Sequence, residues 1–248
     1  MSVPYKWKHS VADAIANRNG TAVEEYLTWV VMPSLAAMEQ RRRELVTSDD
    51  PNSVFSRHDH VQLIERAYKT FCLAIHSMYE QQLRAYLATS LGAATIGGVT
   101  LKKIEKGTWG DELNKLFIKV RGVALDSFDS YPVLTELQML ANACRHGEGD
   151  SARKLHSAHP ELWPSIKQFC WEDVLSAMPP SFLCVKINLG HLSRYVATIS
   201  LFWLDMEARA MDSIVGVPIT YLNSLRDRRV PLLAAATVIP EIEPTPHS

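Results

Sequence analysis

Apolar residues recur at intervals of three and four along most of this 248-residue chain. This spacing places them on one face of an α-helix, which completes a turn every 3.6 residues. Alternation of apolar and polar residues, the pattern of a half-buried strand, is not long enough anywhere to build a sheet. The sequence therefore predicts an all-α protein, a helical bundle with long central helices.

Five long helices are expected from this pattern. The first follows Thr21 and Glu24, which have the spacing of a capping box, and Pro33 is expected to bend it. The central core helix covers about 61–88, and another begins at the start signal of Thr108 and Asp111. The last two cover 133–146 and about 192–210, and residues 182–187 between them are expected to form a short strand or an extended link. The apolar stripes contain Leu27, Leu35, Ile64, Ile75, Leu83, Leu113, Phe117, Leu137, Leu140, Leu192, Ile199 and Trp203.

The end of the chain differs in composition from the rest. Four prolines occur from residue 230 onward, and no periodic apolar pattern accompanies them. We therefore expect a helical domain over 1–229, with an N-terminal helical extension, and a flexible tail over 230–248.

Charge and cysteine content narrow the function classes. Lys and Arg total 26 against 27 Asp and Glu, so the chain has no overall attraction to nucleic acid, and any such site must be a local patch. The four cysteines are widely spaced, which disfavours a zinc site or a disulfide framework. Residues 92–98 lack the Gly-Lys-Ser/Thr ending of a phosphate loop, which disfavours an ATPase. The N-terminus lacks the apolar region of a signal peptide, and no apolar run is long enough to span a membrane, so we expect a cytoplasmic protein without cofactors.

Polar residues gather at the end of the helix over 133–146. At about 100° per residue, Asn142 and His146 lie about 140° and 180° from Leu137, and so project away from the apolar stripe. Arg145 lies at the boundary, and Gly147 with Gly149 ends the helix. The helix dipole favours cations at this end. One interpretation is simple C-terminal capping, and the other is a functional site.

Two segments carry a family resemblance. Residues 136–149 (ELQMLANACRHGEG) resemble the signature helix of the HEPN superfamily, which has an Arg-Asn, three variable residues and a His. Residues 76–83 (HSMYEQQL) are similar to the long helix that precedes it in that family, which typically carries a glutamate just before a leucine; here Glu80 stands three residues before Leu83. The resemblance implies a helical bundle that forms a homodimer and binds or cleaves RNA without a metal, plausibly in a bacterial toxin–antitoxin or antiviral phage-defence system.

The resemblance also implies roles for individual residues. His146 is the expected general acid and base at a ribose 2′-hydroxyl, Asn142 positions the phosphate or the imidazole, and Ala141 stands where the family has arginine. Arg145 is the candidate substitute for that arginine. Glu80 and Glu148 are candidate binding residues of the same site. The alternative is a non-catalytic HEPN-like interaction module that binds a partner protein or a nucleotide on the same polar face.

Two further expectations concern metal binding and assembly. Residues 57–60 (RHDH) have metal-ligand side chains, but Asp59 suits a helix cap and the histidines would splay, so no metal site is expected. Met139 lies about 200° from Leu137, on the polar face, which favours its partial burial in a two-fold homodimer that brings two copies of His146 together.

Overall fold

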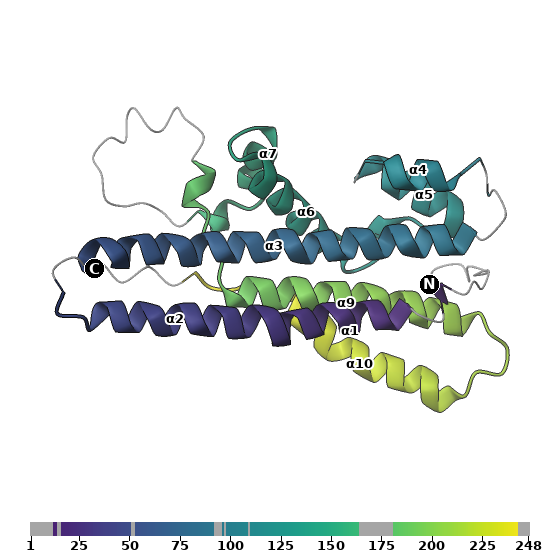
Figure 1. The fold of residues 1–248 in the computed structure, drawn as a ribbon. Helices are drawn as coiled ribbons and strands as arrows, with labels where there is room; N and C mark the ends of the chain where they lie inside the picture. The colour runs from purple at the N-terminus through teal and green to yellow at the C-terminus, as the bar shows by residue number, and fades with distance from the viewer. Residues whose placement is uncertain are drawn as a thin grey trace. The chain divides into compact units, whose positions relative to one another are not determined.

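The computed structural model describes residues 12–13, 16–50, 53–91, 96, 98–108, 110–163 and 181–242 (Figure 1). Helices make up 81% of these residues, and none of them lies in a β-strand. The prediction of an all-α protein with long helices is therefore confirmed. Among the described helices, none combines the length and the apolar character that crossing a bilayer requires.

Ten helices and three short 3₁₀ turns account for the secondary structure of the described residues. The helices are α1 (Ala16–Tyr26), the π-helix η2 (Leu27–Val31), α2 (Met32–Val46), α3 (Ser53–Leu91), α4 (Leu101–Lys106), α5 (Asp111–Arg121), α6 (Tyr131–His146), α7 (Asp150–Ala158), α9 (Leu189–Asp212) and α10 (Ile219–Thr237). The 3₁₀ turns are η3 (Leu125–Ser127), η4 (Pro160–Leu162) and η5 (Phe182–Cys184).

The chain divides into two compact units. Unit 1 contains residues 1–25, 77–134 and 195–238, and unit 2 contains residues 26–76, 135–194 and 239–248. Because α3, α6 and α9 are long, each contributes residues to both units.

Unit 1 has an aromatic core. Its rings pack edge to face or tilted, with centroids 5.0–6.5 Å apart, in the range that favours aromatic pairs. Close packing of α1 on α9 depends on Gly20, since a Cβ there would come within 3.1 Å of Ser200 Cα. The rings belong to Tyr79, Tyr86, Phe117, Phe128, Phe202 and Trp203.

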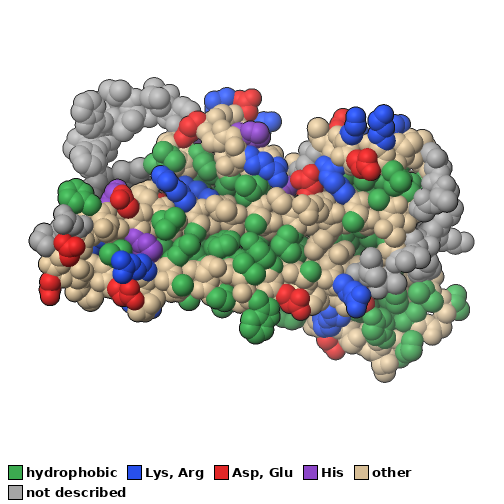
Figure 2. All heavy atoms as spheres, in the orientation of Figure 1, with side chains coloured by type: hydrophobic (Ala, Val, Ile, Leu, Met, Phe, Trp, Pro, Cys, Tyr) green, Lys and Arg blue, Asp and Glu red, His purple; other side chains and the backbone are tan. Residues whose placement is uncertain are grey.

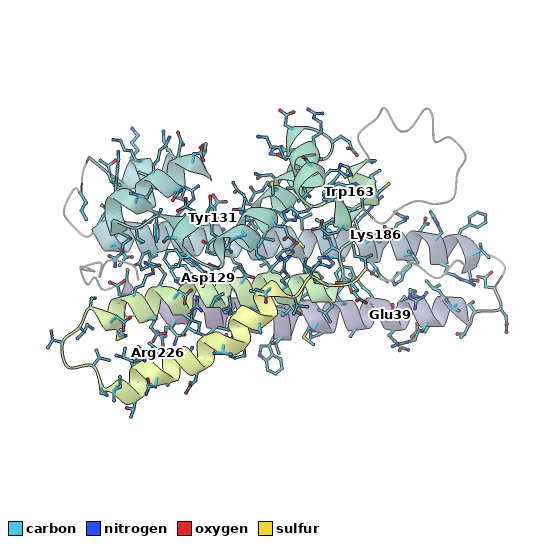
Figure 3. The ribbon with its side chains drawn as sticks, turned by 180° about the vertical axis from the view of Figure 1, so that it is seen from behind. Glu39, Asp129, Tyr131, Trp163, Lys186 and Arg226 are labelled. Carbon is cyan, nitrogen blue, oxygen red and sulfur yellow. The ribbon has the colours of Figure 1, made fainter. Side chains whose placement is uncertain are left out.

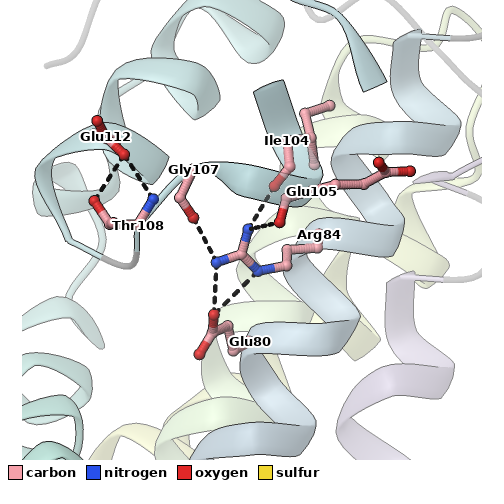
Figure 4. A network of polar contacts seen from close by, with 7 residues as sticks. All are labelled: Glu80, Arg84, Ile104, Glu105, Gly107, Thr108 and Glu112. Carbon is pink, nitrogen blue, oxygen red and sulfur yellow. Dashed lines mark hydrogen bonds and ion pairs between the residues drawn. The ribbon is translucent and has the colours of Figure 1, made fainter. Parts of the chain in front are cut away.

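Two arginines organise the polar contacts of unit 1. Arg84 of α3 forms an ion pair with Glu80 at 2.6 Å and donates to the carbonyl oxygens of residues 104, 105 and 107, at the end of α4 (Figure 4). Arg121 of α5 forms a buried ion pair with Asp13 at 3.1 Å, and the Tyr86 hydroxyl donates to the same carboxylate at 2.7 Å. These contacts hold the short α4 and the N-terminal segment against α3.

Unit 2 contains α2 and the first part of α3 as an antiparallel pair. His60 Nε2 lies 2.7 Å from the carbonyl oxygen of Met38, and Arg57 donates to the carbonyl oxygen of Leu45 at 3.5 Å. The Arg-His-Asp-His sequence at 57–60 thus supplies contacts between these two helices. On α2 itself, Glu39, labelled in Figure 3, pairs with Arg42 at 2.7 Å.

Pro33 is accommodated by a local change in helix type. In a regular α-helix its ring would clash with the carbonyl group four residues earlier, at Trp29. The π-helix η2 contains Trp29, and α2 begins at Met32 with Pro33 in its first turn. A wider turn therefore lies where the sequence predicted only a bend.

Several element boundaries differ from the expected ones. Thr21 is inside α1, so it does not cap a helix, and the central helix begins at Ser53 instead of near 61. Residues 182–184 form η5, not a strand, and α4, capped by Thr100, was not predicted.

The segment expected to be a tail is helical over its first eight residues. α10 ends at Thr237 and contains Pro231 in its interior. Beyond it, the carbonyl oxygen of Glu241 accepts a hydrogen bond from Asn188 Nδ2 at 2.8 Å. Residues 243–248 of the expected tail lie outside the described residues.

Candidate functional site

The polar end of α6 lies in unit 2. Arg145 and His146, in its last turn, are exposed, and Asn142 one turn earlier is half-buried. Ala141, which stands at the family's arginine position, is 0% exposed. The exposed cationic groups of this helix end are therefore Arg145 and, when protonated, His146. Their chemical role stays a prediction.

Glycine ends α6 as the sequence predicts. Gly147 has φ of +66°, a left-handed conformation that favours glycine, and its N–H donates to the carbonyl oxygen of Ala143 at 2.8 Å. The chain turns here into α7, so His146 is the last residue of its helix.

A buried ion pair connects α6 to α9 on the N-terminal side of the candidate residues. Arg194 of α9 donates to both carboxylate oxygens of Glu136 at 2.7 and 2.9 Å, and Glu136 is only 2% exposed. His159 Nδ1 lies 3.7 Å from the same carboxylate and 3.1 Å from Glu161. Breaking such a buried pair costs about 3–5 kcal/mol. Glu136 belongs to the segment that resembles the HEPN signature, yet its pairing was not predicted from the sequence. The signal that could have indicated it is one charged residue of opposite sign within the apolar pattern of each of the two helices, Glu136 in α6 and Arg194 in α9.

Glu148 acts as a clamp, one residue beyond Gly147. Its Oε1 accepts hydrogen bonds from Ser181 Oγ at 2.6 Å and from the backbone N–H of Phe182 at 2.8 Å. Trp163 Nε1 donates to the carbonyl oxygen of Ser181 at 3.0 Å. The candidate binding residue Glu148 therefore fixes the start of η5 beside the end of α6.

Lys69 of α3 completes this clamp. Its ammonium group donates to the carbonyl oxygens of Phe182 and Leu183 at 3.2 and 3.0 Å and lies 5.1 Å from the centroid of the Phe182 ring. Burial lowers the pKa of Lys69, and burial raises the pKa of the neighbouring Cys144 thiol to about 11. At neutral pH this thiol is protonated, which excludes it as a ready nucleophile.

Charges of both signs surround the end of α6. Arg153 and Lys154 of α7 are exposed, and Arg153 pairs with Asp150 on the same helix. Figure 2 shows basic, acidic and histidine side chains together over α7. Glu148 is engaged by η5, and Asp150 forms an ion pair with Arg153. The exposed basic side chains of this corner, Arg145, Arg153 and Lys154, therefore lie among carboxylates on a surface of mixed charge.

Glu80 belongs to unit 1, whereas the candidate residues at the end of α6 belong to unit 2. It forms the ion pair with Arg84 that supports the end of α4. Met139 of α6 is half-buried within the chain itself. Its partial cover therefore does not require a second subunit.

Comparison of this chain with models of known protein families, with curated proteins and with solved structures finds no match.

Proposed function

We propose that this chain is a HEPN-like helical protein that binds RNA through the exposed end of α6. The observation that carries the proposal is the placement of Arg145 and His146 in the last, exposed turn of a helix, with Asn142 one turn before them. A guanidinium and an imidazole at this spacing can both reach one phosphodiester, and the amide of Asn142 can donate to a phosphate oxygen or to a base edge.

The support beneath these residues favours a site over a frayed helix end. The Glu136–Arg194 ion pair holds the middle of α6, and Glu148 ties the residues after the helix to η5. A binding side chain gains from such support because less conformational freedom is lost when the ligand arrives.

Direct RNA-binding measurements test the proposal. We expect Arg145→Ala/His146→Ala to weaken binding of a labelled single-stranded RNA, followed by fluorescence anisotropy, by at least about tenfold at low salt. Arg145→Ala alone should also lower the slope of log K against log salt concentration by about 1.

The matched control for this experiment is Arg41→Ala/His58→Ala. It removes the same two side-chain types from exposed positions of unit 2, on α2 and α3. Equal loss of binding in both double variants would show only a general charge effect and would reject α6 as the site.

The second candidate is a non-catalytic HEPN-like interaction module that binds a partner protein or a nucleotide on the same face. The observation that favours it is the complete burial of Ala141, which leaves the family's arginine position without a cation to stabilise a phosphorane. If His146 were catalytic, wild-type protein would cleave RNA in the presence of EDTA and His146→Ala would not. RNA that is bound by the wild type and stays intact supports RNA binding without catalysis, and RNA that is neither bound nor cleaved supports the interaction module.

A further inference from the structure

A groove follows the outward face of α10 in unit 1. It encloses about 840 Å³ and is lined by Asp129 and by residues 226, 229, 230, 233, 234 and 237 of α10. The α10 positions recur at intervals of three and one, so they form one stripe on one helix face. A stripe with this spacing is the kind of surface on which a second helix packs.

The apolar residues of this part of α10 remain largely uncovered. Residues 230–236 are all apolar, yet Ala236 is the buried one among them. Val230 is 68% exposed, and Ala234 is exposed as well. In the middle of the groove, Val230, the half-buried Leu233 and Ala234 form an apolar patch between Arg226 and Thr237. Leaving such a patch in water is unfavourable, and apolar patches on folded proteins commonly mark an interface.

We propose that a second copy of this chain occupies the groove with its own α10, antiparallel to the first. The charges along the groove support this occupant. Arg226 is exposed toward the N-terminal end of the stripe and lies on α10 in Figure 3, whereas the last turn of α10 has no basic side chain. The C-terminus of a helix carries about half a negative charge and is stabilised by a nearby cation.

An antiparallel pair satisfies both ends at once. Residues 226 and 237 are 11 residues apart, about 16 Å along the helix, so each Arg226 would approach the C-terminal turn of the other α10. Between the ends, Val230, Leu233 and Ala234 would meet their counterparts across the two-fold axis. At the wall of the groove, the Arg229 guanidinium pairs with both Asp129 and Asp205, so these charges already have partners within the chain.

The oligomeric state of the purified full-length chain tests this proposal. Sedimentation velocity between about 1 and 100 μM should show a monomer–dimer equilibrium for the wild type. Val230→Glu/Ala234→Glu should raise the dissociation constant at least about 100-fold, because it places four like charges in the shared seam. Arg226→Glu should raise it by about tenfold, since it places a carboxylate at the negative helix end of the partner.

Two control variants make the outcome decisive. Ile219→Glu adds one carboxylate per chain at an exposed apolar position of α10 outside the groove and should leave the equilibrium unchanged. Met139→Glu tests the alternative interface on α6. A wild-type chain that is monomeric at 100 μM, or a dimer that Met139→Glu dissociates and the Val230/Ala234 variant does not, would overturn the proposal. Unchanged far-ultraviolet circular dichroism establishes that each variant is folded.

Discussion

Replacement of Asp13 by alanine is expected to destabilise unit 1 by about 3–5 kcal/mol. The side chains of Asp13 and Arg121 are 3% and 4% exposed, and their closest N–O distance is 3.1 Å. The substitution leaves the guanidinium buried without this carboxylate and removes an acceptor from the Tyr86 hydroxyl, which is bound at 2.7 Å. A buried donor that loses its acceptor costs about 1–3 kcal/mol, and an unpaired buried charge costs more.

Urea unfolding measures this loss, and hydrogen exchange of the amides of α5 and of residues 77–91 of α3 assigns it to unit 1. A double-mutant cycle with Arg121→Met isolates the ion pair: the double variant should be less destabilised than the sum of the two single variants, by at least about 1 kcal/mol. Asp13→Asn is the matched control, because it retains an acceptor for Tyr86. A loss below about 1 kcal/mol for Asp13→Ala, or strict additivity in the cycle, would refute the reasoning.

Three further perturbations follow from other buried or clamped groups. Glu207 is 5% exposed; its Oε1 accepts a hydrogen bond from the Tyr221 hydroxyl, and its Oε2 has no hydrogen-bond partner among the described residues. Because Tyr221 is 41% exposed, water can replace Glu207 as its acceptor, so Glu207→Met should leave the free energy of unfolding unchanged or raise it by about 1 kcal/mol. A loss above about 2 kcal/mol in urea unfolding would contradict this. Glu148→Ala removes the acceptor of the Phe182 N–H and should speed exchange of that amide, measured by mass spectrometry, with little change in the α2 amides. Burial lowers the pKa of His191 from 6.5 to about 4, so the unfolded chain binds more protons than the folded chain between these pH values. The free energy of unfolding should therefore fall by up to about 3 kcal/mol from pH 6.5 to pH 4, and His191→Gln should remove that part of the pH dependence.

The helical period of apolar residues was sufficient to predict the fold class and the main helices. Of the residues predicted to form the stripe of the central helix, Ile75 and Leu83 are buried in α3, and Ile64 is half-buried. Helix boundaries were predicted less well, because they depend on contacts from distant parts of the chain. The start of α3 is one example, since His60 and Arg57 bind carbonyl groups of α2 there.

The largest difference between the predicted and the observed secondary structure arises from the prolines near the end of the chain. The prolines after residue 230 suggested a tail, yet α10 continues through Pro231. A proline removes one backbone donor and strains one turn, and tertiary contacts can offset this cost. Leu225 and Ala236 of α10 are buried on either side of Pro231, but the sequence gives no sign of what covers them.

The sequence predicted where the candidate residues lie on their helix, but not the tertiary contacts that hold this helix in place. The helical count places Asn142 and His146 away from the apolar stripe, and His146 is exposed in the structure. The contacts of Glu136 with Arg194 and of Glu148 with Phe182 join residues 58 and 34 positions apart, which no local pattern indicates. Their effect is to fix the end of α6 where the proposed ligand binds.

Photochemical crosslinking tests the proposed RNA site most directly. A single-stranded RNA that contains 4-thiouridine would be irradiated with the wild-type chain, and the crosslinked peptides would be sequenced by mass spectrometry. The RNA-binding proposal predicts crosslinks within residues 142–148, at the end of α6, that are lost in Arg145→Ala/His146→Ala and retained in Arg41→Ala/His58→Ala. Crosslinks confined to other segments, or no crosslinked peptide at protein concentrations of about 100 μM, would contradict it.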